Sequence, residues 1–340
     1  MMRYFWPTLV FASTLLAQST TTTYQTDVNG RRVASATTDK SATGTTVSAR
    51  KSVDGKALPL DEATERVIRQ DANGKLVERI IKKYDQNGRV SSTEKVMVEE
   101  TVLPGGGKTV KETVSQSDLN GTFKEVERRT SETRVSGLTT TTTASVDHAN
   151  INGAFTAAEK RSTVTTGPVG KQQTTETVER PDPNGRFRAI SRQETSVAAA
   201  GSTVTSNTAG YELDATGRLQ LTRQAVATTT KRPDGSATTE TNLYTADAAG
   251  RPNGGAAKLV MQEQQVQERK VAADGSFTET VSIRTANPSD PSKLSAARNL
   301  SETVCRGKCV DNAKAAAPVA PAAPVTAPAA KQDAKGKKLP

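Results

Sequence analysis

Three short stretches of this 340-residue sequence carry residues that could do chemistry. Gly105-Gly106-Gly107-Lys108-Thr109 ends like a phosphate-binding loop, but that motif needs a glycine five residues before Gly107, where Val102 stands. We therefore predict a hairpin turn at this point. His148, the one histidine of the chain, lies in a predicted turn, and this placement favours an exposed loop histidine over a catalytic group.

The third stretch holds the two cysteines of the chain, Cys305 and Cys309, on either side of Arg306-Gly307-Lys308. In an exported chain they most simply form a disulfide, which would staple the last hairpin, and a free or intermolecular thiol pair is the alternative. A zinc site would need further Cys or His ligands. We predict no catalytic residue, no metal site and no cofactor, and we expect that the chain is not an enzyme.

Asp-x-Asn-Gly and related tetrapeptides recur along the chain. Asn-Gly and Asp-Gly between runs of β-formers predict hairpin turns, because both residues tolerate a positive φ. Glycine is the fourth residue here and the sixth in an EF-hand loop, so these turns do not match an EF-hand. Incidental calcium contacts at stacked turns stay an open alternative. The residues predicted to form turns are Asp71, Asn73, Gly74, Asp85, Asn87, Gly88, Asp118, Asn120, Gly121, Asp182, Asn184, Gly185, Asp214, Gly217, Asp234, Gly235, Asp274 and Gly275.

The turn glycines show a period. From Gly74 to Gly235 they follow one another at intervals of 14 to 18 residues, and a fixed spacing is typical of repeat architectures. Removing the turns leaves strands of roughly 12 residues joined by tight connections. We therefore predict a sequence unit of about 32 residues, one hairpin long.

The predicted strands have few apolar side chains to bury. Lys95 to Leu103 alternates valines with polar residues, as a half-buried strand does, whereas 139–143 and 174–178 are mostly threonine. Leu, Ile, Val and Phe make up 59 of 340 residues, below the roughly one fifth that a packed core usually needs. The predicted fold is all-β, an elongated antiparallel β-meander or hairpin-repeat strip, single-layer or coiled, with disordered ends. Flat sheet, solenoid and partial barrel are left open.

The chain divides into four predicted parts. Residues 1–17 read as a signal peptide, because the apolar run is too short to cross a bilayer. Residues 18–48 form a Thr/Ser-rich lead-in, partly ordered, and 49–310 form the array of about 16 residues per strand and turn. Residues 311–340 form an Ala/Pro/Lys-rich disordered tail. Lys258 to Val271 also suits a helix, but its place in the array favours a strand. The expected location is secreted, periplasmic or at the bacterial cell surface, with no transmembrane segment after cleavage.

Half of the net charge of +10 lies from Cys305 onward. Lys331, Lys335, Lys337 and Lys338 of the tail could contact an anionic surface or wall polymer. In the strands Lys and Arg alternate with Glu, and aromatic residues make up only 4% of the chain. Nucleic acid is therefore not an expected partner.

Tyr84-Asp85-Gln86-Asn87-Gly88-Arg89-Val90 resembles the signature of YD repeats, which occur in bacterial Rhs-type proteins and teneurins, and 213–219 is a looser copy. The resemblance implies an extracellular β-hairpin array without intrinsic catalysis, which in large family members spirals into a shell. This chain is short for a closed shell. Its composition also resembles the single-layer sheets of some bacterial outer-surface lipoproteins.

These features predict an exported, non-enzymatic repeat protein with a structural or interaction role at the cell surface, in the periplasm or in an extracellular matrix. One alternative is a module that binds a polysaccharide or cell-wall polymer, or a protein partner, through its Thr, Lys and Arg rows. A remoter alternative is an ice-binding face built from Thr-x-Thr rows.

Overall fold

The structure, a computed structural model, describes residues 19–26, 32–40, 44–53, 56–118, 120–214, 216–246, 258–287 and 290–307. These residues form nineteen strands and one short 3-10 turn, η1 (Pro104–Gly106). The strands are β1 Ser19–Thr26, β2 Arg32–Lys40, β3 Gly44–Val53, β4 Lys56–Asp71, β5 Gly74–Tyr84, β6 Val90–Val102, β7 Lys108–Ser117, β8 Phe123–Ser136, β9 Thr139–Ala149, β10 Phe155–Thr166, β11 Lys171–Pro181, β12 Phe187–Ala200, β13 Thr203–Leu213, β14 Leu219–Lys231, β15 Ala237–Ala246, β16 Leu259–Val271, β17 Phe277–Asn287, β18 Asp290–Leu294 and β19 Arg298–Gly307.

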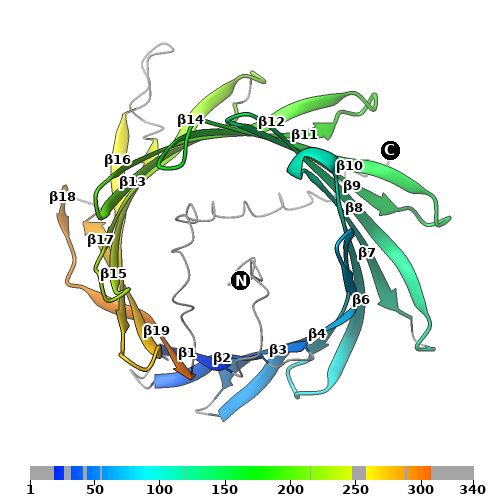
Figure 1. The fold of residues 1–340 in the computed structure, drawn as a ribbon, viewed down its shortest axis with the longest axis horizontal. Helices are drawn as coiled ribbons and strands as arrows, with labels where there is room; N and C mark the ends of the chain where they lie inside the picture. The colour runs from blue at the N-terminus through cyan, green and yellow to red at the C-terminus, as the bar shows by residue number, and fades with distance from the viewer. Residues whose placement is uncertain are drawn as a thin grey trace, which may run out of the picture.

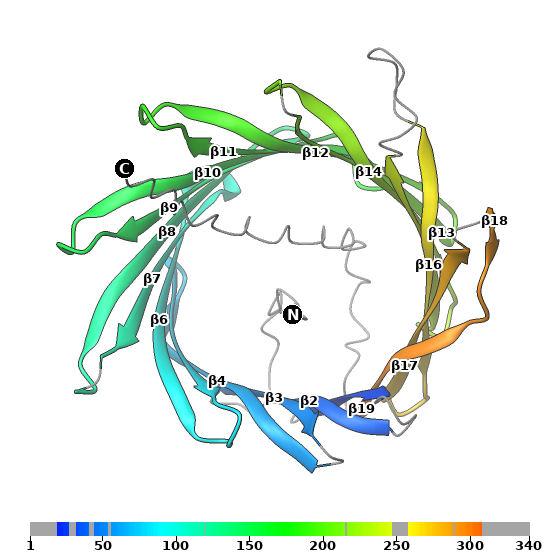
Figure 2. The ribbon, with the colours of Figure 1, turned by 180° about the vertical axis from the view of Figure 1, so that it is seen from behind.

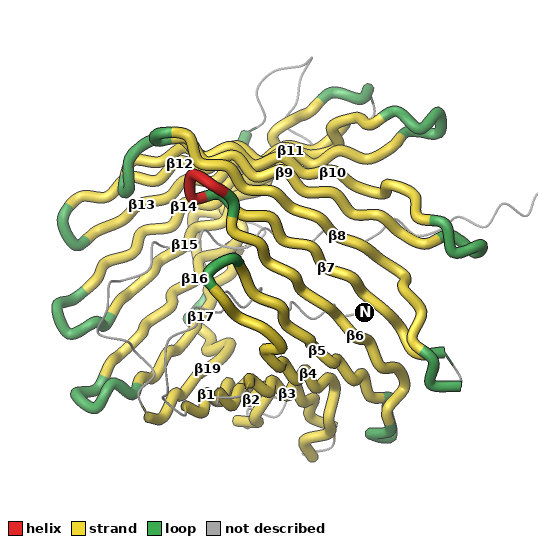
Figure 3. Tube along the Cα trace, turned by 45° about the vertical axis from the view of Figure 1, so that its right-hand side comes forward, coloured by secondary structure: helices red, strands yellow, loops and turns green. Residues whose placement is uncertain are grey.

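The sheet closes on itself. Each strand from β1 to β17 pairs antiparallel with the next, β17 pairs with β19, and β19 pairs with β1, so eighteen of the described strands form a ring (Figure 1). β18 lies beside β17 outside this ring. Seen from behind, the strands form the same closed ring (Figure 2), and they cross the wall obliquely, as in other barrels (Figure 3). The face of the sheet that points into the ring is called the lumenal face.

Closure corrects the predicted architecture. The all-β, antiparallel part of the prediction is confirmed, and so is a strand at β16. The open strip is wrong, because the first and last strands pair from Ser19↔Gly307 to Gln25↔Ser301. A closed ring leaves no sheet edge with unpaired backbone groups. The YD-repeat strip and the likeness to single-layer surface sheets are wrong for the same reason.

A repeated β-bulge accompanies the closure. The ring consists of nine described hairpins, from β1–β2 to β17–β19, and in each the second strand carries one residue without a partner. A bulge bends its strand and increases the local twist, and bulges repeated at one level curve a sheet toward closure. The unpaired residues are Ser35, Leu60, Ser91, Val126, Ala158, Ile190, Thr222, Gln262 and Leu300.

Hydroxyl groups stabilise some of these bulges. Ser91 Oγ donates to the carbonyl oxygen of Lys83 at 3.1 Å, and Thr222 Oγ1 donates to that of Gly210 at 3.2 Å. Both acceptors lie on the partner strand, next to the register shift. The side chain thus supplies a hydrogen bond where the ladder is interrupted.

The two faces of the wall differ in burial. Paired residues in an antiparallel sheet share a face, as do alternate residues along a strand. By this rule every buried side chain of the described strands lies on one face, on which Val96 faces Val114 and Thr195 faces Thr208. Side chains converge on the concave side of a closed sheet, so this is the lumenal face. Its buried members are Ala63, Val77, Val96, Val114, Val178, Thr195, Ser206, Thr208, Ala227, Thr241, Ile283 and Cys305.

Candidate binding surface

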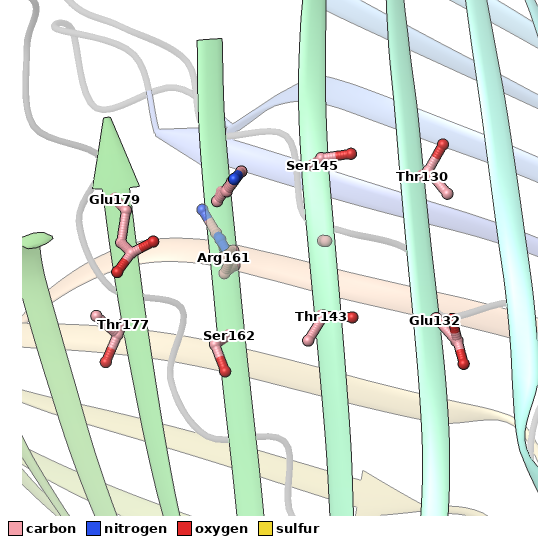
Figure 4. Close-up of a pocket in the computed structure, with 10 residues that line it drawn as sticks. Thr130, Glu132, Thr143, Ser145, Arg161, Ser162, Thr177 and Glu179 are labelled. Atoms are coloured by element: carbon pink, nitrogen blue, oxygen red, sulfur yellow. The ribbon is translucent and has the colours of Figure 1, made fainter. Parts of the chain in front are cut away.

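The outer face of β8–β11 carries a shallow hollow of about 370 Å³. Figure 4 looks onto its residues from outside, with the opposite wall of the barrel behind them. Most of the side chains that line it are hydroxyl groups or charged groups. On the outer face these are Thr130, Glu132, Thr143, Ser145, Lys160, Ser162, Thr177 and Glu179, whereas Ala144 and Arg161, which also line the hollow, are paired residues of the lumenal face.

The register of the four strands arranges eight of these residues as two parallel rows. One row runs Thr130↔Ser145↔Lys160↔Glu179, and the other runs Glu132↔Thr143↔Ser162↔Thr177. Each row therefore crosses all four strands, with one side chain from each. The rows lie two residues apart along every strand, so all eight side chains share the outer face.

Threonine favours strand formation in this region and occupies both faces of the sheet. β9 begins with five threonines, which have strong β propensity. Because side chains alternate, Thr143 lies on the outer face and Thr142 on the lumenal face. The same kind of residue therefore meets two different environments.

The lumenal threonines pair with one another. Their hydroxyl oxygens lie 2.9–3.0 Å apart across neighbouring strands, in the pairs Thr23–Thr303, Thr133–Thr142, Thr165–Thr174, Thr195–Thr208 and Thr229–Thr239. Among the described residues, the hydroxyl groups of the hollow make no such side-chain hydrogen bond. Thr143 and Ser162 are exposed and Thr177 is half-buried. Their hydroxyl groups are thus open to solvent.

Charges at the hollow are nearly balanced. Glu132 pairs with Arg134 on the outer face. Lys160 Nζ lies 4.2 Å from the ring centroid of Phe187, a cation–π contact that holds the ammonium group at the edge of the hollow. Glu179 adds a second carboxylate. The guanidinium of Arg161 lies within 3.3 Å of Glu176, a residue of the lumenal face.

Further along the outer wall, β12 and β13 carry a second polar group. Arg192 pairs with Glu194, and the Tyr211 hydroxyl donates to Glu194 at 3.1 Å. The hydrogen bond from Arg192 is the main cause that lowers the pKa of Glu194, and Tyr211 adds to it. Burial is the main cause that raises the pKa of Tyr211, and the Glu194 carboxylate reinforces the shift.

The predicted turn residues lie at hairpin connections. Asp85 Oδ1 accepts the backbone N–H groups of Asn87 at 2.8 Å and Arg89 at 2.9 Å, and Gly88 has φ of +76°. Asp118, Asp182 and Asp214 make the same pair of bonds, with Asn120, Asn184, Gly121, Gly185 and Gly217 in the same loops, and Asn150 adds a copy that the prediction did not include. In each of these loops the glycine N–H donates to the backbone carbonyl of the Asp or Asn three residues earlier, and the glycine has a left-handed φ, as expected for a hairpin loop that ends in a bulge glycine.

The other predicted turns are variants. Asp71 Oδ1 accepts from the backbone N–H groups of Asn73 and Gly74 in a tighter β4–β5 connection. Asp234 and Asp274 are the third residue of their loops, where each accepts from the serine that follows the glycine. The glycines, Gly235 and Gly275, have φ of +85° and +81°.

Asp214 shows the electrostatic effect of such a turn. The backbone N–H of Arg218 and then the hydroxyl of Thr216 lower the pKa of this carboxyl from 3.8 to about 2. A depressed carboxyl pKa contributes stability that is present above the unfolded value and is lost as the pH falls through the folded value. The Asp214 turn should therefore weaken between pH 3.8 and about 2.

We predict that an NMR titration of the Asp214 carboxyl has its midpoint near pH 2. Thr216→Val removes the hydroxyl donor and should move the midpoint toward 3.8, while Thr216→Ser should leave it nearly unchanged. A wild-type midpoint at 3.8 would contradict the hydrogen-bond arrangement of this turn.

The Gly-rich stretch and His148, which the sequence singles out as possible sites of chemistry, lie in structural positions. Gly105–Gly107 lie in the β6–β7 connection, as predicted, and Lys108 Nζ pairs with Glu100 at 3.1 Å. The placement of His148 in a turn is wrong: it lies within β9, with Nε2 3.2 Å from Glu127 Oε2. The loop begins two residues later, at Asn150, because Asn150 forms the turn bonds.

Cys305 lies on β19, 2% exposed and disulfide-bonded, and accepts a hydrogen bond from Thr21 Oγ1 at 3.1 Å. Cys309 lies outside the described residues, so the Cys305–Cys309 pairing stays a prediction. The signal segment 1–17 and the lysines of the tail also lie outside them. β1, β2 and the first half of β3 belong to the segment 18–48, and the domain limits stay a prediction.

Metal clusters and spanning helices are two further features that bear on function. Within the described ranges, no group of three or more His, Cys, Asp or Glu side chains could hold a metal ion. In the same part of the chain, no helix has the length and apolar character needed to cross a membrane.

The chain was compared with known proteins. No family model and no curated protein matches it. A solved structure with a similar fold is in-vitro folded OmpT, an outer membrane protein of Vibrio cholerae, in its trimer form. The match has a TM-score of 0.44 and 8% identity, and covers 85% of this chain and 97% of that one.

Sequence reasoning missed the hollow. Its threonines and serines belong to runs whose composition indicates only β-strands. The available signal was the alternation within 139–145 and 160–163, which divides the hydroxyl groups between two faces. The sequence did not show which strands would lie side by side.

Proposed function

We propose that the chain is an exported, non-enzymatic barrel protein of the bacterial cell surface, with a structural or binding role, and that the outer wall of the barrel faces water. The observation that carries the proposal is a set of ion pairs in the middle of the outer wall. Glu78, near the centre of β5, lies 2.8 Å from Lys95 and 3.1 Å from Arg66. All three residues are on the outer face.

These ion pairs are ionised and hydrated. The hydrogen bond from Lys95 is the main cause that lowers the pKa of Glu78, and Arg66 adds to it, so the carboxylate keeps its charge at neutral pH. The side chain of Arg66 is 67% exposed and that of Lys95 is 36% exposed. The Arg192–Glu194 pair repeats the pattern on β12.

A wall that faces lipid needs a different composition. Membrane barrels carry an outward apolar band about 25 Å tall, and a charged side chain at its centre costs about 2–4 kcal/mol. Here the mid-strand positions of the outer face on β4–β6 and β8–β9 hold mostly Arg, Lys, Glu, Ser and Thr side chains, with Ile80 and Met97 among them. Water is the solvent that fits this face.

The non-enzymatic part of the proposal rests on the inventory of the chain. Its single histidine is engaged with Glu127. The predicted Asp residues serve as acceptors for backbone N–H groups in turns, which is a structural task. The outer wall therefore offers hydroxyl, carboxylate and ammonium groups that can recognise a ligand.

Detergent partitioning tests the proposal. The chain isolated from an exporting bacterium is expected to stay in the aqueous phase of a Triton X-114 separation and to run as a discrete species without detergent. Transfer to the detergent phase, or loss of the species without detergent, would refute a hydrated wall.

Two matched variants check the assignment of faces. Glu78→Leu with Lys95→Leu makes the outer wall more apolar and should raise the fraction in detergent. Glu65→Leu with Arg79→Leu removes a 3.0 Å ion pair from the lumenal face and should not raise it. The opposite order would show that the faces are reversed.

A further inference from the structure

We propose that the outer hollow of β8–β11 binds a neutral polysaccharide, laid along the two rows that cross the four strands. The inference deepens the binding role proposed above by naming a site and a ligand class. It begins from the contrast between the paired lumenal threonines and the hydroxyl groups of the hollow, which have no side-chain partner among the described residues.

Open hydroxyl groups in a fixed array favour a polyhydroxylated ligand. Each Thr or Ser hydroxyl can donate one hydrogen bond and accept two, as a sugar hydroxyl can. The five hydroxyl groups of the hollow are those of Thr130, Thr143, Ser145, Ser162 and Thr177. They stand on a sheet whose backbone ladder fixes their positions, so a ligand need not order a loop.

The dimensions of the array suit a chain. Neighbouring strands lie about 4.8 Å apart, so four strands present side chains over roughly 14 Å. The step between strands is close to the advance of one pyranose unit along an extended glycan. A polymer crossing the strands would therefore meet one side chain of each row at each step.

The charges of the hollow offer an anionic chain no net attraction. Of the eight side chains in the two rows, Lys160 is the one cation, and Glu132 and Glu179 are anions at diagonally opposite corners. Arg161 is directed to Glu176 on the lumenal face. Each carboxylate can accept hydrogen bonds from sugar hydroxyl groups, and charge-assisted bonds of this kind are the stronger ones.

Affinity electrophoresis tests the site with soluble dextran, hydroxyethyl cellulose and mixed-linkage β-glucan as probes, and alginate as an anionic comparison. We expect at least one neutral polymer to retard the wild-type chain. Thr143→Val with Thr177→Val removes two hydroxyl groups at nearly constant shape and should weaken the retardation at least tenfold. Glu179→Gln should weaken it less, because the amide still accepts.

The matched control is Thr205→Val with Thr228→Val, a directly paired couple on the outer face of β13 and β14. It should bind as the wild type does, with the same circular dichroism spectrum. The proposal is overturned if no neutral polymer retards the chain, if both double variants lose binding equally, or if alginate alone is retarded. Each of those results leaves the detergent partitioning of the wall unaffected.

Discussion

Gly74→Ala is expected to destabilise the barrel by about 3 kcal/mol or more, because the new methyl group has no space. A Cβ built on Gly74 would lie 1.9 Å from the carbonyl oxygen of Glu100 and 3.1 Å from the Cα of Thr101. Both neighbours are backbone atoms of β6, which cannot rotate away as a side chain can. In thermal unfolding the melting temperature should fall by roughly 6–12 °C.

Gly121→Ala is the matched control for that substitution. Gly121 also has a positive φ, +78°, but no atom lies within 4 Å of the position that its new methyl group would take. It should therefore cost only the left-handed backbone strain, about 1–2 kcal/mol. Equal effects of the two substitutions would mean that β6 does not pack on the β4–β5 turn in this way.

The hairpins could be predicted from the sequence because their causes are local. An aspartate or asparagine followed three residues later by glycine, as at Asp85 and Gly88, contains within five residues every group that forms the turn. The spacing of such turns then sets the strand lengths. No contact distant in sequence is needed for either feature.

Closure could not be predicted because its causes are not local. It needs Ser19–Thr26 to pair with Arg298–Gly307, at the opposite end of the chain. Closure is also accompanied by a bulge in each hairpin. The bulge position is occupied by side chains of different types, such as Ser91, Val126, Ile190 and Gln262. A bulge depends on which residues face each other, and a single strand does not reveal that.

The hollow escaped prediction for a related reason. Thr142 and Thr143 are identical in type and adjacent in sequence, yet one pairs with Thr133 in the lumen and the other lines the outer hollow. Alternation separates the two faces, but only curvature decides which face is outside. Glu132 and Glu179 line the same hollow only because β8–β11 pair in this register.

Thr23→Cys with Thr303→Cys is expected to form a disulfide on air oxidation and to stabilise the chain by about 5 kcal/mol, since it closes a loop of nearly the whole barrel. The two residues are directly paired across the β1–β19 seam, and their hydroxyl oxygens are 3.0 Å apart on the lumenal face. Only a closed ring brings them together. Mass spectrometry of non-reduced peptides would detect the link, and unfolding with and without reductant would measure its effect.

Thr23→Cys with Thr142→Cys is the control, because β1 and β9 lie apart around the ring and are not paired. That pair should stay unlinked under the same oxidation. An open strip would keep β1 and β19 apart at its two ends, so an unlinked Thr23–Thr303 variant in folded protein would contradict closure. A cross-linked Thr23–Thr142 control would instead indicate disulfide exchange with the native cysteines. Loss of that cross-linked peptide after Cys305→Ser is added would establish the exchange. A disulfide across the β1–β19 seam therefore distinguishes a closed barrel from an open strip.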